Sequence, residues 1–284
     1  MQNEVHYASI IIDDPLLRED YGFLNYRKLL NLMDKHDFST TIAFIPWNYK
    51  RTDKKIAALF TERPDRFSLC VHGCDHTKGE FGKKDLNYLE NKVRLATARM
   101  LEHEKITGIP FDRTMVFPQG IFSNEALEAL QLNNYIAAIN TEPAPVNGAI
   151  SSNFPFFIRH KPEDVMQGVH SNPLFIVLHH DYFKNGYERL AEFVDDLNER
   201  FQIKWDSTGN IIKNYVSTAP LLNNKKIEVH LNGLTFYGYK EYIQIVIRRY
   251  LSELRDNYLC KNEYILQCAN KILMFAKMMH KPKS

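Results

Sequence analysis

Short apolar runs alternate with helix-like segments through the first 205 residues, and this alternation most constrains the fold. The runs are apolar at odd and even positions alike, which indicates strands that are covered on both faces. The segments between them repeat apolar residues every three or four positions, as amphipathic helices do. Strands of this kind joined by helices are typical of parallel sheets, so the predicted fold class is α/β. The expected strands are 7–12, 40–45, 67–71, 114–117, 135–139, 154–158, 174–178 and 201–205, and the expected helices are 24–32, 53–62, 83–106, 187–200 and one capped by Ser123.

The composition argues against several classes of function. The 284 residues carry 36 basic and 34 acidic side chains, a net charge of +2, so nothing favours binding to nucleic acid or to an anionic membrane. No apolar run approaches the roughly 18 residues of a membrane span. The polar start, residues 1–7, lacks the apolar core of a signal peptide. Four cysteines are too few for a disulfide scaffold, so we expect a reduced chain in the cytoplasm.

The sequence changes character after about residue 206. Residues 225–231 alternate like a solvent-facing strand, and residues 239–258 and 264–279 have the apolar stripes of two helices. We therefore expect a barrel domain at 1–206 and a C-terminal appendage at 207–284, made of a strand or hairpin and two helices. The alternative is a plain extension of the core. The apolar stripes also make the C-terminal helices a candidate surface for a homo-oligomer.

Polar side chains gather directly after several of the predicted strands. In parallel α/β barrels the active site lies at the ends where the strands finish, so groups from separate strands meet on one rim. We expect the site of this chain to be built there. The polar segments that follow strands are 13–14, 47–48, 72–76, 119, 140–141 and 179–181.

Two of these segments predict a metal site. The adjacent carboxylates of Asp13 and Asp14 end a buried strand, where a charge costs on the order of several kcal/mol unless it is paired or bound to metal. His72 and His76 leave another strand, and one loop can bring both imidazoles to one cation. We predict that Asp14, His72 and His76 bind one divalent metal, with Asp13 beside it as a base.

A different metal site remains open from the spacing alone. Cys70, His72, Cys74 and His76 alternate, and in an extended strand all four would share one face. Structural zinc sites more often carry cysteines in Cys-x-x-Cys pairs, which favours the first site over this one.

The order of these segments resembles the motifs of the polysaccharide deacetylase superfamily over residues 5–206. The resemblance implies a distorted (β/α) barrel of about seven strands. It implies that Asp13 is the catalytic base, that Asp14, His72 and His76 bind a metal, commonly zinc, and that His180 is the general acid. The segments that carry the resemblance are Ile12-Asp13-Asp14, His72-Gly73-Cys74-Asp75-His76, Phe117-Pro118-Gln119-Gly120 and Leu178-His179-His180-Asp181.

The chain departs from the family pattern at two positions. Gly73 stands where the family usually has Ser or Thr, and a shifted alignment would make His76 and Glu80 the ligands in place of His72 and His76. Val116 stands where the family carries an Arg that orients the base. Arg159, from another strand, is a candidate for the place of that Arg.

The predicted reaction is hydrolysis of an acetyl group from an N-acetylated (or O-acetylated) sugar or saccharide by metal-activated water. Asp13 would accept the proton of the water, and His180 would protonate the leaving amine. Trp47, Gln119 and Tyr182 follow strands and are expected to contact the small-molecule or glycan substrate. Two other functions stay open. One is hydrolysis of another C–N bond, as in a cyclic amide or ureide, and the other is carbohydrate binding by a protein whose catalytic site has lapsed.

Overall fold

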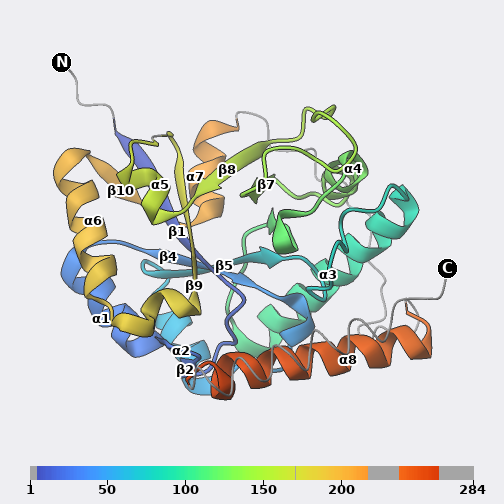
Figure 1. Cartoon of the computed structure of the whole chain (residues 1–284), viewed down its shortest axis with the longest axis horizontal. Helices are drawn as coiled ribbons and strands as arrows, with labels where there is room; N and C mark the ends of the chain where they lie inside the picture. The colour runs from blue at the N-terminus through green and yellow to red at the C-terminus, as the bar shows by residue number, and fades with distance from the viewer. Residues whose placement is uncertain (1–4, 170, 217–236, 262–284) are drawn as a thin grey trace.

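The computed structural model describes residues 5–169, 171–216 and 237–261 (Figure 1). The strands of the main sheet are parallel, and β1 pairs with β4 on one side and with β9 on the other. This pairing closes a seven-stranded barrel, which confirms the α/β prediction, and β10 adds to the start of β1. The strands are β1 (His6–Asp13), β4 (Thr40–Phe44), β5 (Phe67–His72), β6 (Thr114–Val116), β7 (Ala137–Asn140), β8 (Phe156–His160), β9 (Leu174–His179) and β10 (Ile203–Trp205).

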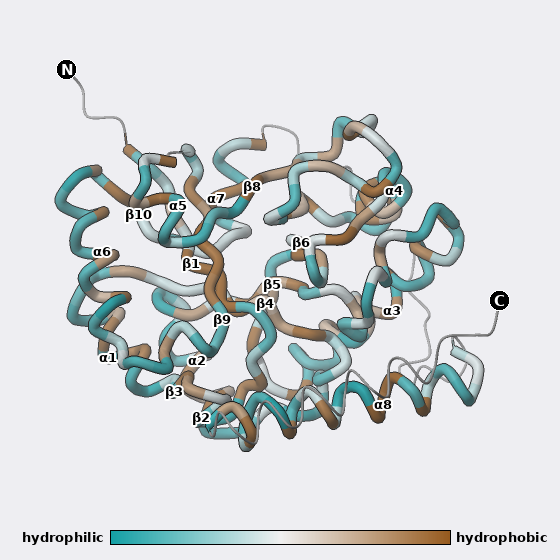
Figure 2. The backbone as a smooth tube through the Cα atoms, viewed as in Figure 1, coloured by the Kyte–Doolittle hydropathy of each residue, from teal (hydrophilic) through white to brown (hydrophobic). Residues whose placement is uncertain are grey.

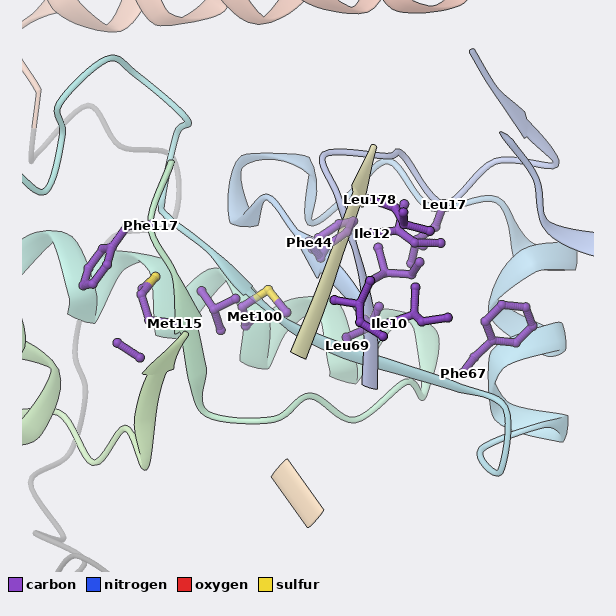
Figure 3. Packing of buried hydrophobic residues seen from close by; sticks show 14 of the residues in the cluster. Ile10, Ile12, Leu17, Phe44, Phe67, Leu69, Met100, Met115, Phe117 and Leu178 are labelled. Carbon is purple, nitrogen blue, oxygen red and sulfur yellow. The ribbon is translucent and has the colours of Figure 1, made fainter. Parts of the chain in front are cut away.

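Successive residues of a barrel strand enter two different apolar cores. In β1, Ile11 belongs to an inner cluster, whereas Ile10 and Ile12 belong to an outer cluster shared with the helices. This alternation is the period of two that strands impose on side chains, and it explains why the strands are apolar on both faces. Figure 3 shows part of the outer cluster, and Figure 2 shows the hydrophobic run along β9. The inner cluster consists of Ile11, Ala43, Cys70, Val116, Ala137, Ile139, Phe175, Ile211 and Ile212.

Helices cover the outside of the barrel and connect most of its successive strands (Figure 1). The predicted cap is confirmed, because the Ser123 hydroxyl accepts the Ala126 N–H. The helix expected at 24–32 begins two residues later, since Leu24 and Asn25 pair in a small hairpin and Asn25 caps the helix. The strands of the small hairpin are β2 (Asp20–Tyr21) and β3 (Leu24–Asn25). The α-helices and short 3-10 helices between the barrel strands are α1 (Tyr26–His36), η1 (Pro46–Asn48), α2 (Lys54–Glu62), α3 (Leu86–Thr107), η2 (Pro118–Gly120), α4 (Asn124–Leu132), α5 (Pro162–Met166), η3 (His180–Asn185) and α6 (Glu188–Arg200).

Helix α7 (Thr208–Tyr215) belongs to the barrel, although the sequence analysis placed its residues in the appendage. Its Ile211 and Ile212 are fully buried in the inner cluster. Its first residue, Thr208, contacts the hydroxyls of Thr41 and Thr114, which stand at the starts of β4 and β6. The helix therefore closes the end of the barrel opposite the site. We propose that the boundary between barrel and appendage lies beyond residue 216.

The predicted helix at 239–258 is confirmed as α8 (Tyr239–Leu254), which continues into η4 (Arg255–Leu259). It lies along one side of the barrel (Figure 1), where Glu253 forms ion pairs with Arg18 and Arg51. The other face leaves apolar side chains exposed, among them Tyr239 and Tyr250, and homo-oligomer formation there stays a prediction. The strand expected at 225–231 and the helix expected at 264–279 lie outside the described residues. None of the helices that the structure describes is both long and apolar enough to cross a membrane.

Candidate metal centre

The predicted ligands lie at the C-terminal ends of β1 and β5, on backbone that turns sharply. Asp13 is the last residue of β1, and Asp14 follows with a φ of 76°. His72 is the last residue of β5, and Gly73, with a φ of 61°, opens the loop. His76 has a φ of 57°, a left-handed value that few non-glycine residues adopt. The loop thereby returns the His76 imidazole to the end of β1, beside Asp14.

The three predicted ligands meet at one point. Asp14 Oδ1 lies 3.2 Å from His72 Nε2 and 3.0 Å from His76 Nε2. The carbonyl oxygen of Val116 lies 3.0 Å from His72 Nδ1 and accepts only, so Nδ1 carries a proton and Nε2 faces Asp14. The buried Oδ1 of Asp14 has no hydrogen-bond donor. A carboxylate oxygen and an imidazole nitrogen at this distance share either a proton or a metal ion.

This donor set fits the metal that the resemblance implies. Two imidazole nitrogens and one carboxylate are a common ligand set for catalytic zinc, and they leave coordination positions for water and substrate. The hydrogen bond from His72 to Val116 is the kind of outer contact that fixes the tautomer of a metal-binding histidine. The residues therefore suit a divalent ion, while its identity stays a prediction.

The charges at this point also set the ionisation of its members. Burial would raise the pKa of Asp14, but His76 and His72 outweigh it and hold this pKa well below its usual range. Burial would lower the pKa of His72, but the carboxylates of Asp13 and Asp14 raise it above its ordinary value. Asp14 is therefore a carboxylate at neutral pH, the form that binds metal.

Neither alternative metal site is assembled. Glu80 faces the loop and accepts the N–H of Cys74 at 2.9 Å, so it is no partner for His76 in a shifted ligand pair. Cys70 lies in the inner apolar cluster, and the sulfur of Cys74 accepts from Arg99 at 3.3 Å. Within residues 5–169, 171–216 and 237–261, the one group of His, Cys, Asp and Glu with metal-ligand spacing is Asp14, His72 and His76.

Asp13, the predicted base, pairs with Arg159 from β8. The Nη1 of Arg159 donates to Asp13 Oδ1 at 2.6 Å, and its Nε donates to Thr141 Oγ1 at 3.2 Å. Burial would raise the pKa of Asp13, but Arg159 and His72 outweigh it and hold this pKa below its ordinary value. Val116, where the family carries an Arg, is packed in the inner cluster. The structure therefore forms the contact expected of Arg159.

A cavity of about 660 Å³ opens above these groups and is lined by Asp13, Asp14, His72 and His76. Two of the three expected substrate contacts, Gln119 and Tyr182, also line it. Trp47 is absent from its lining. The indole lies 4.9 Å from the Arg99 guanidinium and 5.4 Å from the ring of Tyr242, between α3 and α8.

The structure separates the two adjacent histidines at the end of β9. His179 has the same parity as Phe175 of the inner cluster, is paired in register with Asp13, and lines the main cavity. His180 has the opposite parity. Its ring packs on Tyr21 and Phe23, its Nε2 lies 3.8 Å from Asp256, and it lines a second cavity of about 380 Å³. The main cavity thus contains Asp13 and His179, whereas His180 lines the second cavity, which Asp14 and His179 also line.

The main cavity has a charged rim that was not among the residues predicted from the sequence. Lys161, Glu163 and Arg189 line it, and Arg189 forms an ion pair with Glu163 and lies 4.8 Å from the ring of Tyr182. Lys161 and Glu163 follow the end of β8, so the rule that polar residues after strands form the site would have found them. The predicted strand stopped at residue 158, two residues before β8 ends.

No protein-family profile matches the sequence, and no curated protein matches it. Solved structures do match. A Mycobacterium smegmatis protein described as a polysaccharide deacetylase is 12% identical, with a TM-score of 0.51, over 78% of this chain and 95% of that one. The carbohydrate esterase family 4 domain of a xylanase from the hindgut metagenome of Trinervitermes trinervoides is 11% identical, with a TM-score of 0.50, over 78% and 96%. The chain has the carbohydrate esterase family 4 fold.

A third similar structure shows that this fold alone does not establish catalytic activity. It is described as a pseudoenzyme of carbohydrate esterase family 4 from Bacillus anthracis, is 11% identical and has a TM-score of 0.50. The match covers 74% of this chain and 66% of the pseudoenzyme, just under two thirds of its length. Since a pseudoenzyme shares this fold, catalytic activity can be inferred only from the residues of the site.

Proposed function

We propose that this protein is a metal-dependent hydrolase that removes an acetyl group from an N-acetylated or O-acetylated sugar or saccharide. One observation carries the proposal: the Asp14 carboxylate faces two imidazoles at the floor of a cavity that also contains the ionised Asp13. Acyl hydrolysis needs a site for a metal, a base beside it and room for the substrate, and these side chains supply all three.

The roles of the individual residues follow from their contacts. A divalent ion held by Asp14, His72 and His76 would polarise the acyl oxygen and make a water more acidic. Asp13 accepts the proton of that water, because its low pKa leaves the carboxylate free of a proton at neutral pH. Arg159 holds the Asp13 carboxylate in place with a buried bond of 2.6 Å. Since this bond replaces the Arg of the family motif, the absence of Arg at position 116 no longer favours a lapsed site.

The leaving nitrogen needs a proton, and the end of β9 offers two donors. The motif assigns the role to His180, and that assignment stays a prediction. The geometry supports His179 more directly, because it lines the main cavity with Asp13 while the His180 ring packs on Tyr21 and Phe23. A proton donor has to reach the leaving group in the substrate pose.

The rim supports a hydroxyl-rich substrate. Gln119, Lys161 and Glu163 offer hydrogen-bond donors and acceptors around the cavity, and the Tyr182 ring offers an apolar face of the kind on which a sugar packs. A small-molecule or glycan substrate is therefore proposed. Location in the cytoplasm stays a separate prediction.

Metal content and acetate release test the proposal together. The purified protein is loaded with zinc, its bound metal is measured, and it is incubated with N-acetyl sugars, O-acetylated saccharides and cyclic amides. We expect one metal per chain and acetate release from an acetylated sugar. Asp14→Asn should lose both, and Asp13→Asn should keep the metal and lose turnover. Bound zinc without acetate release from any sugar contradicts the proposal, and amine release from a cyclic amide alone favours the other hydrolase.

A further inference from the structure

The loop that carries His76 closes around one buried carboxylate. Three consecutive backbone N–H groups donate to Glu80: Cys74 to Oε1 at 2.9 Å, Asp75 to Oε2 at 3.1 Å and His76 to Oε1 at 3.1 Å. The hydroxyl of Thr77 adds a fourth contact, to Oε2 at 3.3 Å. Successive N–H groups that converge on an anion form a strong and directional site. The backbone of the metal-binding loop therefore takes its shape from the Glu80 side chain.

Two cations make this burial tolerable. Lys92 Nζ lies 3.4 Å from Glu80 and 2.9 Å from Asp75, and Arg99 Nη1 lies 2.7 Å from Asp75. All four side chains are at most 1% exposed, and two carboxylates balance two cations. The hydroxyl of Tyr237, which precedes α8, donates to Asp75 and completes the cluster. A neutral, fully paired cluster is rigid, whereas a buried charge without a partner is costly.

Gly73 and Glu80 depend on each other. Gly73 has a left-handed φ of 61°, and a Cβ at this position would lie 2.2 Å from Glu80 Oε1 and 2.4 Å from Pro118 Cγ. A side chain at residue 73 would displace the carboxylate that the next three N–H groups need. Glycine at position 73 and glutamate at position 80 thus form one structural unit directly after His72.

We propose that Glu80 is the positioning residue for His76, and that it sets the loop so that the imidazole reaches the point it shares with Asp14 and His72. Glu80 contacts neither the cavity nor Asp14 in this role, and it acts through the backbone of residues 74–76. The inference rests on the proposed metal site. It adds that the geometry of this site is fixed by a residue of the Glu80 cluster rather than by the ligands alone.

Zinc affinity and the visible spectrum of the cobalt-substituted protein test this role. Glu80→Ala should lower zinc affinity about 10- to 100-fold, as loss of an outer contact to a metal ligand commonly does, and should change the cobalt absorption bands. Glu80→Gln should also lose affinity, because its amide nitrogen faces the donors of Asp75, Thr77 and Lys92. Gly73→Ala should resemble Glu80→Ala, and the double variant should lose less than the sum of the two. Glu62→Ala, an exposed position on α2, is the control and should bind zinc like the wild type.

A second readout separates this inference from the proposed function. Hydrogen exchange of the amides of residues 74–76, measured without metal, should be at least about 10-fold faster in Glu80→Ala and Glu80→Gln than in the wild type. Unchanged exchange, or wild-type zinc affinity and cobalt bands in a folded Glu80 variant, would overturn the inference even if the wild type releases acetate. Faster exchange with no acetate release from the wild type would support the loop role and reject the proposed reaction.

Discussion

Arg159→Met should destabilise the protein and impair Asp13 through the loss of one contact. The two side chains are 2.6 Å apart and no more than 5% exposed. Removal of one partner of a buried ion pair costs about 3–5 kcal/mol, because the other charge stays buried without compensation. In a domain of this size about 1 kcal/mol corresponds to roughly 2–4 °C, so the melting temperature should fall by about 6–20 °C.

The same change should alter the pH dependence of catalysis. In the wild type the pKa of Asp13 lies below its ordinary value of 3.8, so the carboxylate is ionised above that pH and its stabilising effect is lost as the pH falls through the lowered pKa. Without Arg159, burial is the largest remaining influence and it raises the pKa. The acid limb of kcat/KM should therefore move to higher pH in Arg159→Met, and Arg159→Lys should restore part of the shift.

Thermal unfolding followed by circular dichroism tests the stability effect independently of activity. The double variant Asp13→Asn, Arg159→Met should recover most of the lost stability, because it also removes the Asp13 charge that Arg159→Met alone leaves buried without a partner. Arg189→Met is the matched control, since that guanidinium is 60% exposed and its ion pair should contribute less than about 1 kcal/mol. The reasoning is refuted if Arg159→Met costs no more than the control, or if the double variant is no more stable than the single one.

The remaining predictions concern the proton donor, acid stability, the C-terminal helix and the metal. His179→Ala should lower kcat on an N-acetyl sugar more than His180→Ala does, with zinc binding unchanged in both, and a larger loss at His180 would restore the assignment drawn from the motif. Burial lowers the pKa of His103 from 6.5 to about 4. The free energy of unfolding should therefore fall by about 3 kcal/mol as the pH drops from 6.5 to 4, because the unfolded chain takes up a proton that the folded chain does not. His103→Gln should weaken this pH dependence in denaturant unfolding. Glu253→Ala should speed hydrogen exchange in α8 while changing the melting temperature of the barrel little, since its ion pairs with Arg18 and Arg51 are partly exposed. Zinc at 1,000 times its dissociation constant should stabilise the protein by about 4 kcal/mol, and Asp14→Asn should abolish the gain in a thermal scan.

The barrel and the convergence of Asp14, His72 and His76 were accessible from the sequence because both follow from local rules. Apolar runs between amphipathic segments predict parallel strands, and polar residues after strands predict a shared rim. Asp14, His72 and His76 obey this rule, and the structure brings them within hydrogen-bonding distance of one another. The place of helix α7 in the barrel was not predicted. Its buried pair, Ile211 and Ile212, contacts strands that lie far earlier in the chain, and no local pattern indicates such contacts.

The contacts across the barrel could not be predicted in the same way. Arg159 and Asp13 are 146 positions apart, and only closure of the sheet places β8 near β1. Trp47 follows a strand, as Gln119 and Tyr182 do. Its ring nevertheless packs against the Arg99 guanidinium of the Glu80 cluster and does not line the main cavity. The choice between His179 and His180 did have a sequence signal, because residues 175, 177 and 179 share the face that carries the inner core.

The surroundings of the buried carboxylates favour Asp14 as the proposed metal ligand. Asp13 pairs with Arg159, Asp75 pairs with Lys92 and Arg99, Glu80 shares Lys92, and Asp256 pairs with Arg255. The Asp14 side chain is 23% exposed, but its Oδ1 atom is buried. Two imidazoles face this atom, and the hydrogen bond to Val116 turns the Nε2 of His72 toward it. A carboxylate left without a cation in such surroundings destabilises the fold unless an ion completes it. A divalent metal at this point, as proposed, would supply the positive charge that Asp14 Oδ1 lacks.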